Sequence, residues 1–247
     1  MNEQRILDFF QDKGGWFSKL PHPYEDLVSG HAHLFDDERL RWFLNEVDIS
    51  GQLVVELGPL EGAHTYMLAE AGARQIVSIE SNLAAYFKCL VVKEFYHLEN
   101  VYVRFGDCLQ WLPKQPRYGV CIASGILYHQ TQPAELIAQI AQHCRCLYLW
   151  THYYDPEHPA LKSKHAEPDR CSTRGFDYTG YRIAYETFPH IGGAEPYARW
   201  MSREDLFRCL EHFGLHVEAV NFDEPDHPNG PALALIATKE DREWFQS

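Results

Sequence analysis

Two histidines stand where the sequence could place a base for proton transfer. His129 follows the apolar segment 119–125, and His152 follows another apolar segment, 146–151. An imidazole can take a proton from a hydroxyl nucleophile near neutral pH, so either histidine could be a general base. Tyr128, next to His129, could shape the pocket for the molecule that reacts. Because the chain has 14 histidines, most of them must have ordinary surface or hydrogen-bonding roles.

A short segment with two glycines could hold a ligand through its backbone. Residues Leu53–Gly62 read LVVELGPLEG, an apolar stretch followed by Glu56 and then by Gly58 and Gly62. Glycine lets the backbone approach a ligand without a clash from Cβ. A strand followed by an acidic residue, a glycine-containing turn and a helix is typical of α/β sheets that bind adenosine-type ligands. A tight turn between strand and helix would by itself also account for both glycines.

The spacing of these glycines disfavours a dinucleotide. Dinucleotide-binding turns read G-x-G-x-x-G, which lets a pyrophosphate rest on the N-terminus of the next helix. Here three residues, Pro59, Leu60 and Glu61, separate Gly58 from Gly62. The Glu61 carboxylate would place a negative charge close to that pyrophosphate. The spacing therefore favours another adenosine-type ligand.

Acidic residues follow two further apolar segments. The segment 75–81 reads as a strand that ends in Glu80, about 20 residues past the glycines, where a carboxylate can accept hydrogen bonds from ribose hydroxyls. The segment 101–106 reads as a strand that is followed by Asp107 and Cys108. Asp107 could also cap the helix that follows it, and both roles can hold together.

The order of these elements indicates the fold class. The expected strands lie at 53–55, 75–81, 101–106, 119–125, 146–151, 216–222 and 232–238. The expected helices lie at 63–71, at 81–96, after Pro133 and after Ser202. Strands that alternate with helices at this pitch predict an α/β fold, a mostly parallel, doubly wound sheet with helices on both faces.

Composition and periodicity divide the chain into four parts. Residues 1–50 form an N-terminal helical extension, 51–152 the cofactor-binding core, 153–200 an insertion and 201–247 the remainder of the core. The insertion is rich in Pro, Gly, His, Tyr and Arg and lacks sustained periodicity. A long irregular segment in a compact domain usually has a function, so we expect the insertion to cover the substrate. Its aromatic residues argue against full disorder, and Tyr178 and Tyr181 are candidate substrate contacts.

The composition also narrows the class of partner. The chain has 247 residues and a formal net charge of −13, which disfavours nucleic acid because lysine and arginine must neutralise phosphates. No apolar run is long enough to span a membrane, and the N-terminus lacks the apolar core of a signal peptide. Seven irregularly spaced cysteines fit a reducing compartment. We therefore expect a cytoplasmic protein that acts on a small molecule. The oligomeric state is not readable from the sequence.

One polar segment could in principle bind a divalent cation. Asp155, Glu157 and His158 lie just past the expected strand 146–151, and hard cations favour oxygen ligands. The run DPEHP is equally an ordinary polar turn, so no metal is expected.

The glycine segment and the acidic strand ends together resemble a known family. The segment from about Leu53 to Trp150 resembles the class I S-adenosylmethionine (SAM) methyltransferases, whose first motif is E/D-x-G-x-G-x-G. The residues that carry the resemblance are Glu56, Gly58, Gly62, Glu80 and Asp107. Leu60 stands in place of the middle glycine of the motif.

The resemblance implies a Rossmann-like sheet of seven strands with the last strand antiparallel, and SAM as the cofactor. It also implies that Asp107 meets the adenine amino group and that the backbone N–H of Cys108 meets a ring nitrogen. Ser124, at the end of the expected fourth strand, is a further candidate contact with the cofactor.

A second motif resembles one branch of this superfamily. Gly125–His129, reading GILYH, and Pro133 are similar to the G-V-L-Y-H-x-x-x-P stretch of the bacterial tRNA wobble-uridine carboxymethyltransferase branch and related uncharacterised methyltransferases. The strongly negative net charge departs from what a tRNA enzyme needs, and the arginines of the insertion alternate with acidic residues. We therefore take SAM as the expected cofactor from this resemblance, but we do not take tRNA as the expected substrate.

These observations predict a SAM-dependent methyltransferase that acts on a small molecule, by O-methylation of a hydroxyl or carboxylate. A hydroxyl acceptor needs a base, which would be His129 or His152. Two alternatives stay open, a tRNA-modifying (carboxy)methyltransferase and a non-catalytic SAM-binding protein.

Overall fold

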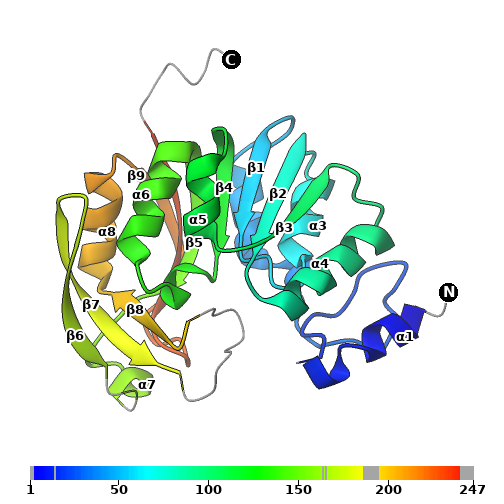
Figure 1. Ribbon diagram of the computed structural model, residues 1–247, viewed down its shortest axis with the longest axis horizontal. Helices are drawn as coiled ribbons and strands as arrows, with labels where there is room; N and C mark the ends of the chain where they lie inside the picture. The colour runs from blue at the N-terminus through cyan, green and yellow to red at the C-terminus, as the bar shows by residue number, and fades with distance from the viewer. Residues whose placement is uncertain (1–2, 14, 163, 165, 186–194, 240–247) are drawn as a thin grey trace. The chain divides into compact units, whose positions relative to one another are not determined.

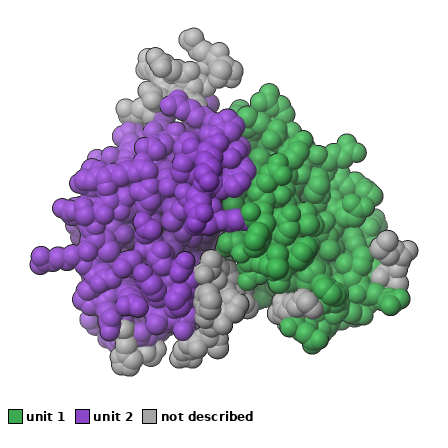
Figure 2. All heavy atoms as spheres, viewed as in Figure 1, with its two compact units in different colours: residues 1–105 green, residues 106–247 purple. Residues whose placement is uncertain are grey.

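Three parallel strands form the sheet of the first of two compact units, residues 1–105 (Figures 1 and 2). They are β1 (Leu53–Leu57), β2 (Gln75–Glu80) and β3 (Val101–Phe105). Nearly every side chain of β1 and β2 is buried, which explains the unbroken apolar runs because both faces of such strands are covered. The computed structural model describes residues 3–13, 15–162, 164, 166–185 and 195–239.

Helix α3 (Ala63–Glu70) connects β1 to β2, and α4 (Leu83–Phe95) connects β2 to β3. Helices α1 (Glu3–Asp8) and α2 (Glu38–Glu46) precede β1, as do the short 3-10 helices η1 (Gln11–Lys13) and η2 (Leu34–Asp36). The Asn82 side chain caps α4 by accepting a hydrogen bond from the backbone N–H of Ala85. Gly62 precedes α3, so the glycine segment runs directly into a helix, as the sequence predicts.

The second unit, residues 106–247, holds the remaining strands of the main sheet. They are β4 (Tyr118–Ser124), β5 (Cys144–His152), β9 (His216–Glu224) and β10 (Ala232–Thr238). β4 pairs parallel with β5, whereas β10 pairs antiparallel with both β5 and β9. The strand order is β3-β2-β1-β4-β5-β10-β9. The predicted Rossmann-like sheet of seven strands with an antiparallel last strand is therefore confirmed.

The helices of the second unit are α5 (Cys108–Trp111), α6 (Pro133–His143), α7 (Pro159–Lys162) and α8 (Arg203–His212), with η3 (Leu112–Lys114) and η4 (Leu127–His129). Pro133 occupies the first turn of α6, where its missing N–H costs nothing. The Ser202 hydroxyl caps α8 by accepting from the N–H of Asp205. Among the described residues, no helix combines the length and apolarity that a membrane crossing requires.

The described part of the insertion is largely regular, so the irregular structure expected there is wrong for these residues. It forms an antiparallel sheet of β6 (Glu167–Thr173), β7 (Phe176–Ala184) and β8 (Tyr197–Met201) (Figure 1). Arg174 and Gly175, both with positive φ, make the two-residue hairpin turn between β6 and β7. The turn lacks the usual Asn-Gly or Asp-Gly pair, and β6 carries mostly polar residues, so the hairpin escapes a search for apolar periodicity. The part of the predicted lid at 186–194 lies outside the described residues.

Candidate functional site

The glycine loop, defined here as residues 58–62, turns the chain from β1 into α3 through three left-handed residues. Gly58 has φ 67°, Leu60 has φ 56° and Gly62 has φ 80°. A Cβ on Gly62 would lie 3.4 Å from the Cα atom of Cys89, so α4 packs close to this turn. Leu60 replaces the middle glycine of the motif yet keeps a backbone conformation that favours glycine. The backbone form of the motif is therefore present although one of its glycines is not.

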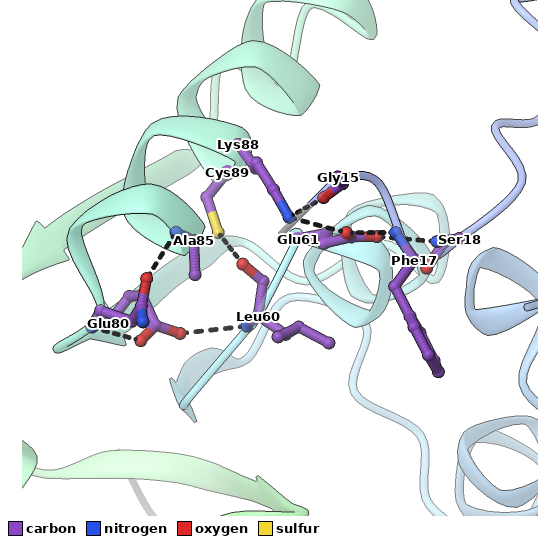
Figure 3. A network of polar contacts seen from close by, with 10 residues as sticks. Gly15, Phe17, Ser18, Leu60, Glu61, Glu80, Ala85, Lys88 and Cys89 are labelled. Carbon is purple, nitrogen blue, oxygen red and sulfur yellow. Dashed lines mark hydrogen bonds and ion pairs between the residues drawn. The ribbon is translucent and has the colours of Figure 1, made fainter. Parts of the chain in front are cut away.

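Glu80, the last residue of β2, holds its carboxylate beside this loop (Figure 3). One oxygen accepts from the backbone N–H of Leu60 at 3.1 Å, and the other accepts from that of Asn82 at 2.8 Å. The side chain is buried, which raises its pKa to about 7 against the opposing effect of these hydrogen bonds. Each carboxylate oxygen can accept more than one hydrogen bond, so this geometry leaves capacity for the two hydroxyls of a ribose. Glu80 thus stands in an environment that suits its predicted role.

Glu56, the fourth residue of β1, has a different setting. Its carboxylate accepts from the Thr65 hydroxyl of α3 and from the Ser78 hydroxyl of β2, the latter at 2.8 Å. Glu56 is buried, and burial raises its pKa. These contacts brace β1, β2 and α3 beneath the glycine loop. The direct cofactor contact predicted for Glu56 stays a prediction.

Glu61 faces the protein interior and not a ligand (Figure 3). Its carboxylate forms an ion pair with Lys88 of α4 at 3.1 Å and accepts from the backbone N–H groups of Phe17 at 2.6 Å and Ser18 at 2.9 Å. Lys88 also donates to the carbonyl of Gly15. The Glu61 charge is therefore compensated, so the argument that it would repel a pyrophosphate is wrong, and only the glycine spacing disfavours a dinucleotide. The ion pair joins the glycine loop to α4, and the hydrogen bonds of Phe17 and Ser18 with Glu61 attach the N-terminal segment to the loop.

The second unit carries the other predicted cofactor contacts. The Asp107 carboxylate accepts from the N–H of Leu109 at 2.9 Å and so caps α5, which confirms the capping role. Cys108 is buried, and Ser124 is the half-buried last residue of β4. The predicted contacts of these three residues with adenine or the cofactor stay predictions.

The two candidate bases lie in one cluster of rings, which we call the aromatic cluster: Tyr128, His129, Trp150, His152, Tyr185, Trp200 and His227. The Tyr128 ring stands between the two histidines, with its centroid 4.3 Å from that of His129 and 4.7 Å from that of His152. The sequence prediction that both histidines share one edge of the sheet thus agrees with the structure. A cavity of about 10 Å3 beside Tyr128 and His152 has room for about one water molecule.

His152 has a fixed tautomer. Its Nδ1 lies 2.7 Å from the carbonyl oxygen of Gly230, and a carbonyl can only accept, so Nδ1 carries the proton. The ring stacks on Trp200 with centroids 5.3 Å apart and planes 6° apart. Burial lowers the pKa of His152 to about 4, so the ring is neutral at physiological pH, with its lone pair on Nε2.

His129 has a different partner. Its Nδ1 lies 2.7 Å from the hydroxyl oxygen of Tyr185, the residue that follows β7. His129 is the half-buried last residue of η4, whereas only 7% of His152 is exposed. Sequence reasoning missed Tyr185 because nothing in the sequence relates it to a residue 56 positions earlier. Recognising a hairpin in the insertion would have indicated that Tyr185 returns toward the main sheet.

The two tyrosines predicted as substrate contacts have other neighbours. The Tyr181 ring stacks on Tyr154 with centroids 3.7 Å apart. Tyr178 is buried beside Phe176 and lines a separate cleft of about 660 Å3 next to the first turn of α8. Tyr185 makes the hydrogen bond to His129, whereas Tyr178 and Tyr181 pack against other rings, and their predicted substrate contacts stay predictions. The described residues contain no group of three or more His, Cys, Asp or Glu side chains arranged to hold a metal ion.

Comparisons with known proteins place this geometry in context. No protein-family model matches the sequence. A tRNA U34 carboxymethyltransferase from Marinobacter nauticus is 28% identical over 97 residues, which cover 38% of this chain and 28% of that enzyme. The match spans well under two thirds of that relative.

Two solved structures share the fold over most of the chain. The N-terminal domain of EvdMO1, crystallised in the presence of S-adenosylhomocysteine (SAH) and D-fucose, is 21% identical, with a TM-score of 0.72 and 97% of both chains covered. A 1,6-didemethyltoxoflavin-N1-methyltransferase from Burkholderia thailandensis, with its namesake compound and S-adenosylhomocysteine bound, is 15% identical, with a TM-score of 0.55 over 83% of this chain and 80% of that one. The chain therefore has the fold of the SAM-dependent methyltransferases.

Proposed function

We propose that this protein is a SAM-dependent methyltransferase that methylates a hydroxyl group of a small molecule, with His129 as the general base. The observation that carries the proposal is the Glu80 carboxylate, fixed beside the glycine loop by two backbone N–H groups. The fold, shared with chains crystallised with S-adenosylhomocysteine, supports the same cofactor.

The residues around the glycine loop fit an adenosine ligand. Gly58 carries no side chain that would obstruct the approach of a ligand to the turn, and Gly62 lets the turn pack closely against α4. Glu80 would accept hydrogen bonds from the ribose hydroxyls, and these would favour its ionised form over the protonated form that burial favours. When bound, SAM supplies an electrophilic methyl group. The residues of this chain then have to hold the cofactor, orient the acceptor and remove a proton.

His129 suits the base role better than His152. A base works best when its pKa lies near the working pH, and burial holds the pKa of His152 near 4. His129 is also the more exposed of the two. His129 would take the proton from the acceptor hydroxyl, while the neutral His152 ring, stacked on Trp200, forms a wall of the acceptor site.

The insertion would supply part of the acceptor site. Tyr185 follows β7 and Trp200 lies in β8, and both belong to the aromatic cluster. Aromatic walls with a few polar groups are typical of small-molecule sites. The negative net charge and the small molecules named for the two structural relatives support the same class of acceptor.

A tRNA-modifying carboxymethyltransferase is the second candidate. It is favoured by the partial similarity to the enzyme from Marinobacter nauticus. The charge of −13 weighs against it, because tRNA binding needs many phosphate contacts.

Transfer of a labelled methyl group from SAM would test the proposal. We expect label in a hydroxylated small molecule from a panel that begins with D-fucose, and none in bulk tRNA lacking the modification. Label in tRNA would favour a tRNA methyltransferase. The second candidate transfers a carboxymethyl group, which SAM does not carry, so the same tRNA is also incubated with a labelled carboxymethyl sulfonium analogue of SAM, and label from that donor would favour it. Binding of SAH without transfer to any member of a broad panel would favour a non-catalytic SAM-binding protein.

A further inference from the structure

We propose that Tyr185 is a positioning residue for His129: its hydroxyl oxygen accepts a hydrogen bond from Nδ1–H and so fixes the orientation and tautomer of the imidazole. This proposal rests on the proposed function, in which His129 is the base. The hydroxyl oxygen lies 2.7 Å from Nδ1 of His129, a short distance for such a hydrogen bond. The bond joins the end of the insertion strand β7 to the loop after β4.

Both partners are held in place by their own surroundings. The backbone N–H of Tyr185 donates to the carbonyl of Pro196 at 3.0 Å, and that of His129 donates to the carbonyl of Ile126 at 3.0 Å. The Tyr185 ring packs against a buried apolar cluster of the insertion that includes Ile183 and Trp200. A group that is itself fixed can orient its neighbour, which is what a positioning role requires.

The 2.7 Å contact fits either direction of the hydrogen bond, because a tyrosine hydroxyl can accept from Nδ1–H or donate to Nδ1. In the proposed direction the hydroxyl oxygen accepts from Nδ1–H, and the lone pair of the neutral ring then lies on Nε2. Burial raises the pKa of Tyr185, so the phenol keeps its proton and remains an uncharged partner. With this direction of the hydrogen bond, Nε2 is the nitrogen that would take the proton from the acceptor. In the second histidine of the cluster, the carbonyl of Gly230 selects the same tautomer.

The substitution Tyr185→Phe removes only the hydroxyl oxygen and keeps the packed ring. Tyr181→Phe is the matched control, because Tyr181 lies on the same strand and its ring stacks on Tyr154. Nitrogen-15 NMR of labelled histidine, with His129 assigned by its loss in His129→Ala, reports the tautomer directly. We expect a protonated Nδ1 and a bare Nε2 in the wild type, changed shifts for both in Tyr185→Phe, and wild-type shifts in Tyr181→Phe.

Kinetics with an acceptor identified by the methyl-transfer panel provide the second readout. We expect Tyr185→Phe to lower kcat about tenfold, as the loss of one hydrogen bond would, with KM for the acceptor unchanged. In a His129→Ala background the same substitution should have no further effect, because Tyr185 acts through His129.

Three results would overturn the proposal. A protonated Nε2 in the wild type, or unchanged His129 shifts in Tyr185→Phe, would show that Tyr185 does not set this tautomer. An equal loss of kcat in the His129→Ala background would show that Tyr185 acts independently. A wild-type rate for His129→Ala alone would refute the base assignment in the proposed function, whereas the nitrogen shifts would still decide the role of Tyr185.

Discussion

The glycine loop and the aromatic cluster fix their side chains by different physical means. Around the loop, backbone N–H groups hold buried carboxylates: Leu60 and Asn82 donate to Glu80, and Phe17 and Ser18 donate to Glu61. In the cluster, aromatic rings pack against one another. His129 also makes a hydrogen bond with the Tyr185 hydroxyl, and His152 makes one with the carbonyl of Gly230. The loop is thus a polar site built by a short stretch of backbone, and the cluster is an apolar site built by tertiary packing.

The buried titratable groups of the two regions respond to pH in opposite directions. Burial raises the pKa of Glu80 to about 7 and lowers that of His152 to about 4, so each group tends toward its neutral form. The same physical cause therefore gives the two regions opposite dependence of stability on pH. This contrast can be tested region by region.

The largest effect should come from breaking the ion pair of the glycine loop. Glu61→Ala leaves the Lys88 ammonium buried without its carboxylate and removes the acceptor for two backbone N–H groups. We expect the free energy of unfolding to fall by about 3–5 kcal/mol, measured by urea denaturation. Glu99→Ala, at an exposed position of the same unit, is the control. A loss below about 1 kcal/mol would show that the network does not stabilise the loop.

In the aromatic cluster, removing the proposed base should lower turnover and leave the affinity for the cofactor unchanged. His129→Ala should lower turnover about 100-fold or more, since general-base catalysis contributes at least that factor. SAH affinity should stay at the wild-type value. His152→Gln should lower turnover less than His129→Ala does, because a base with a pKa of about 4 takes up a proton poorly at neutral pH. A rate that rises only near pH 4, with His129→Ala fully active, would transfer the base role to His152.

The pH dependence of unfolding should separate the two regions with a smaller effect. Above pH 6.5, the ordinary pKa of the ring, His152 is neutral in both the folded and the unfolded chain. Between that value and about 4 only the unfolded chain binds the proton, so His152 should reduce the free energy of unfolding by about 2 kcal/mol from pH 6.5 to 5. Glu80 has the opposite sign: its contribution is present below pH 4.5 and is lost as the pH rises through about 7.

Single substitutions should expose each contribution. His152→Gln should make the protein more stable toward acid relative to wild type, and Glu80→Gln should make it less stable toward acid. His216→Gln, at an exposed position, should leave the profile unchanged. Identical profiles for all three variants would contradict the assigned burial effects.

The smallest effect concerns the left-handed residue in the glycine loop. Leu60→Gly should be more stable than Leu60→Ala by about 1 kcal/mol, because only glycine adopts a φ of 56° without strain. Thermal unfolding of the two variants measures the difference, and the shared loss of the Leu60 side chain cancels. An alanine variant as stable as the glycine variant would show that the turn relaxes.

The contrast also explains what the sequence could predict. Gly58, Gly62 and Glu80 act through local backbone geometry, so their spacing predicts the loop, and apolar runs predict the strands on which they lie. The partners of Glu61, at positions 17 and 18, come from a remote segment that no local pattern connects to it. Tyr185, the tyrosine of the insertion that contacts His129, could not be predicted for the same reason, because it meets His129 only after the β6–β7 hairpin has formed.

Calorimetric titration with SAH tests the central claim, that the glycine loop and Glu80 bind the cofactor. We predict binding by the wild type and an affinity lowered about 100-fold or more by Glu80→Ala, since two hydrogen bonds from the ribose to a charged group are lost. The SAH affinity of Glu80→Gln should lie between those of the wild type and Glu80→Ala, and the affinity of Glu99→Ala should equal that of the wild type. Equal affinity in the wild type and Glu80→Ala, with both variants folded by thermal unfolding, would contradict the ribose assignment. Absence of binding by the wild type would contradict the account as a whole.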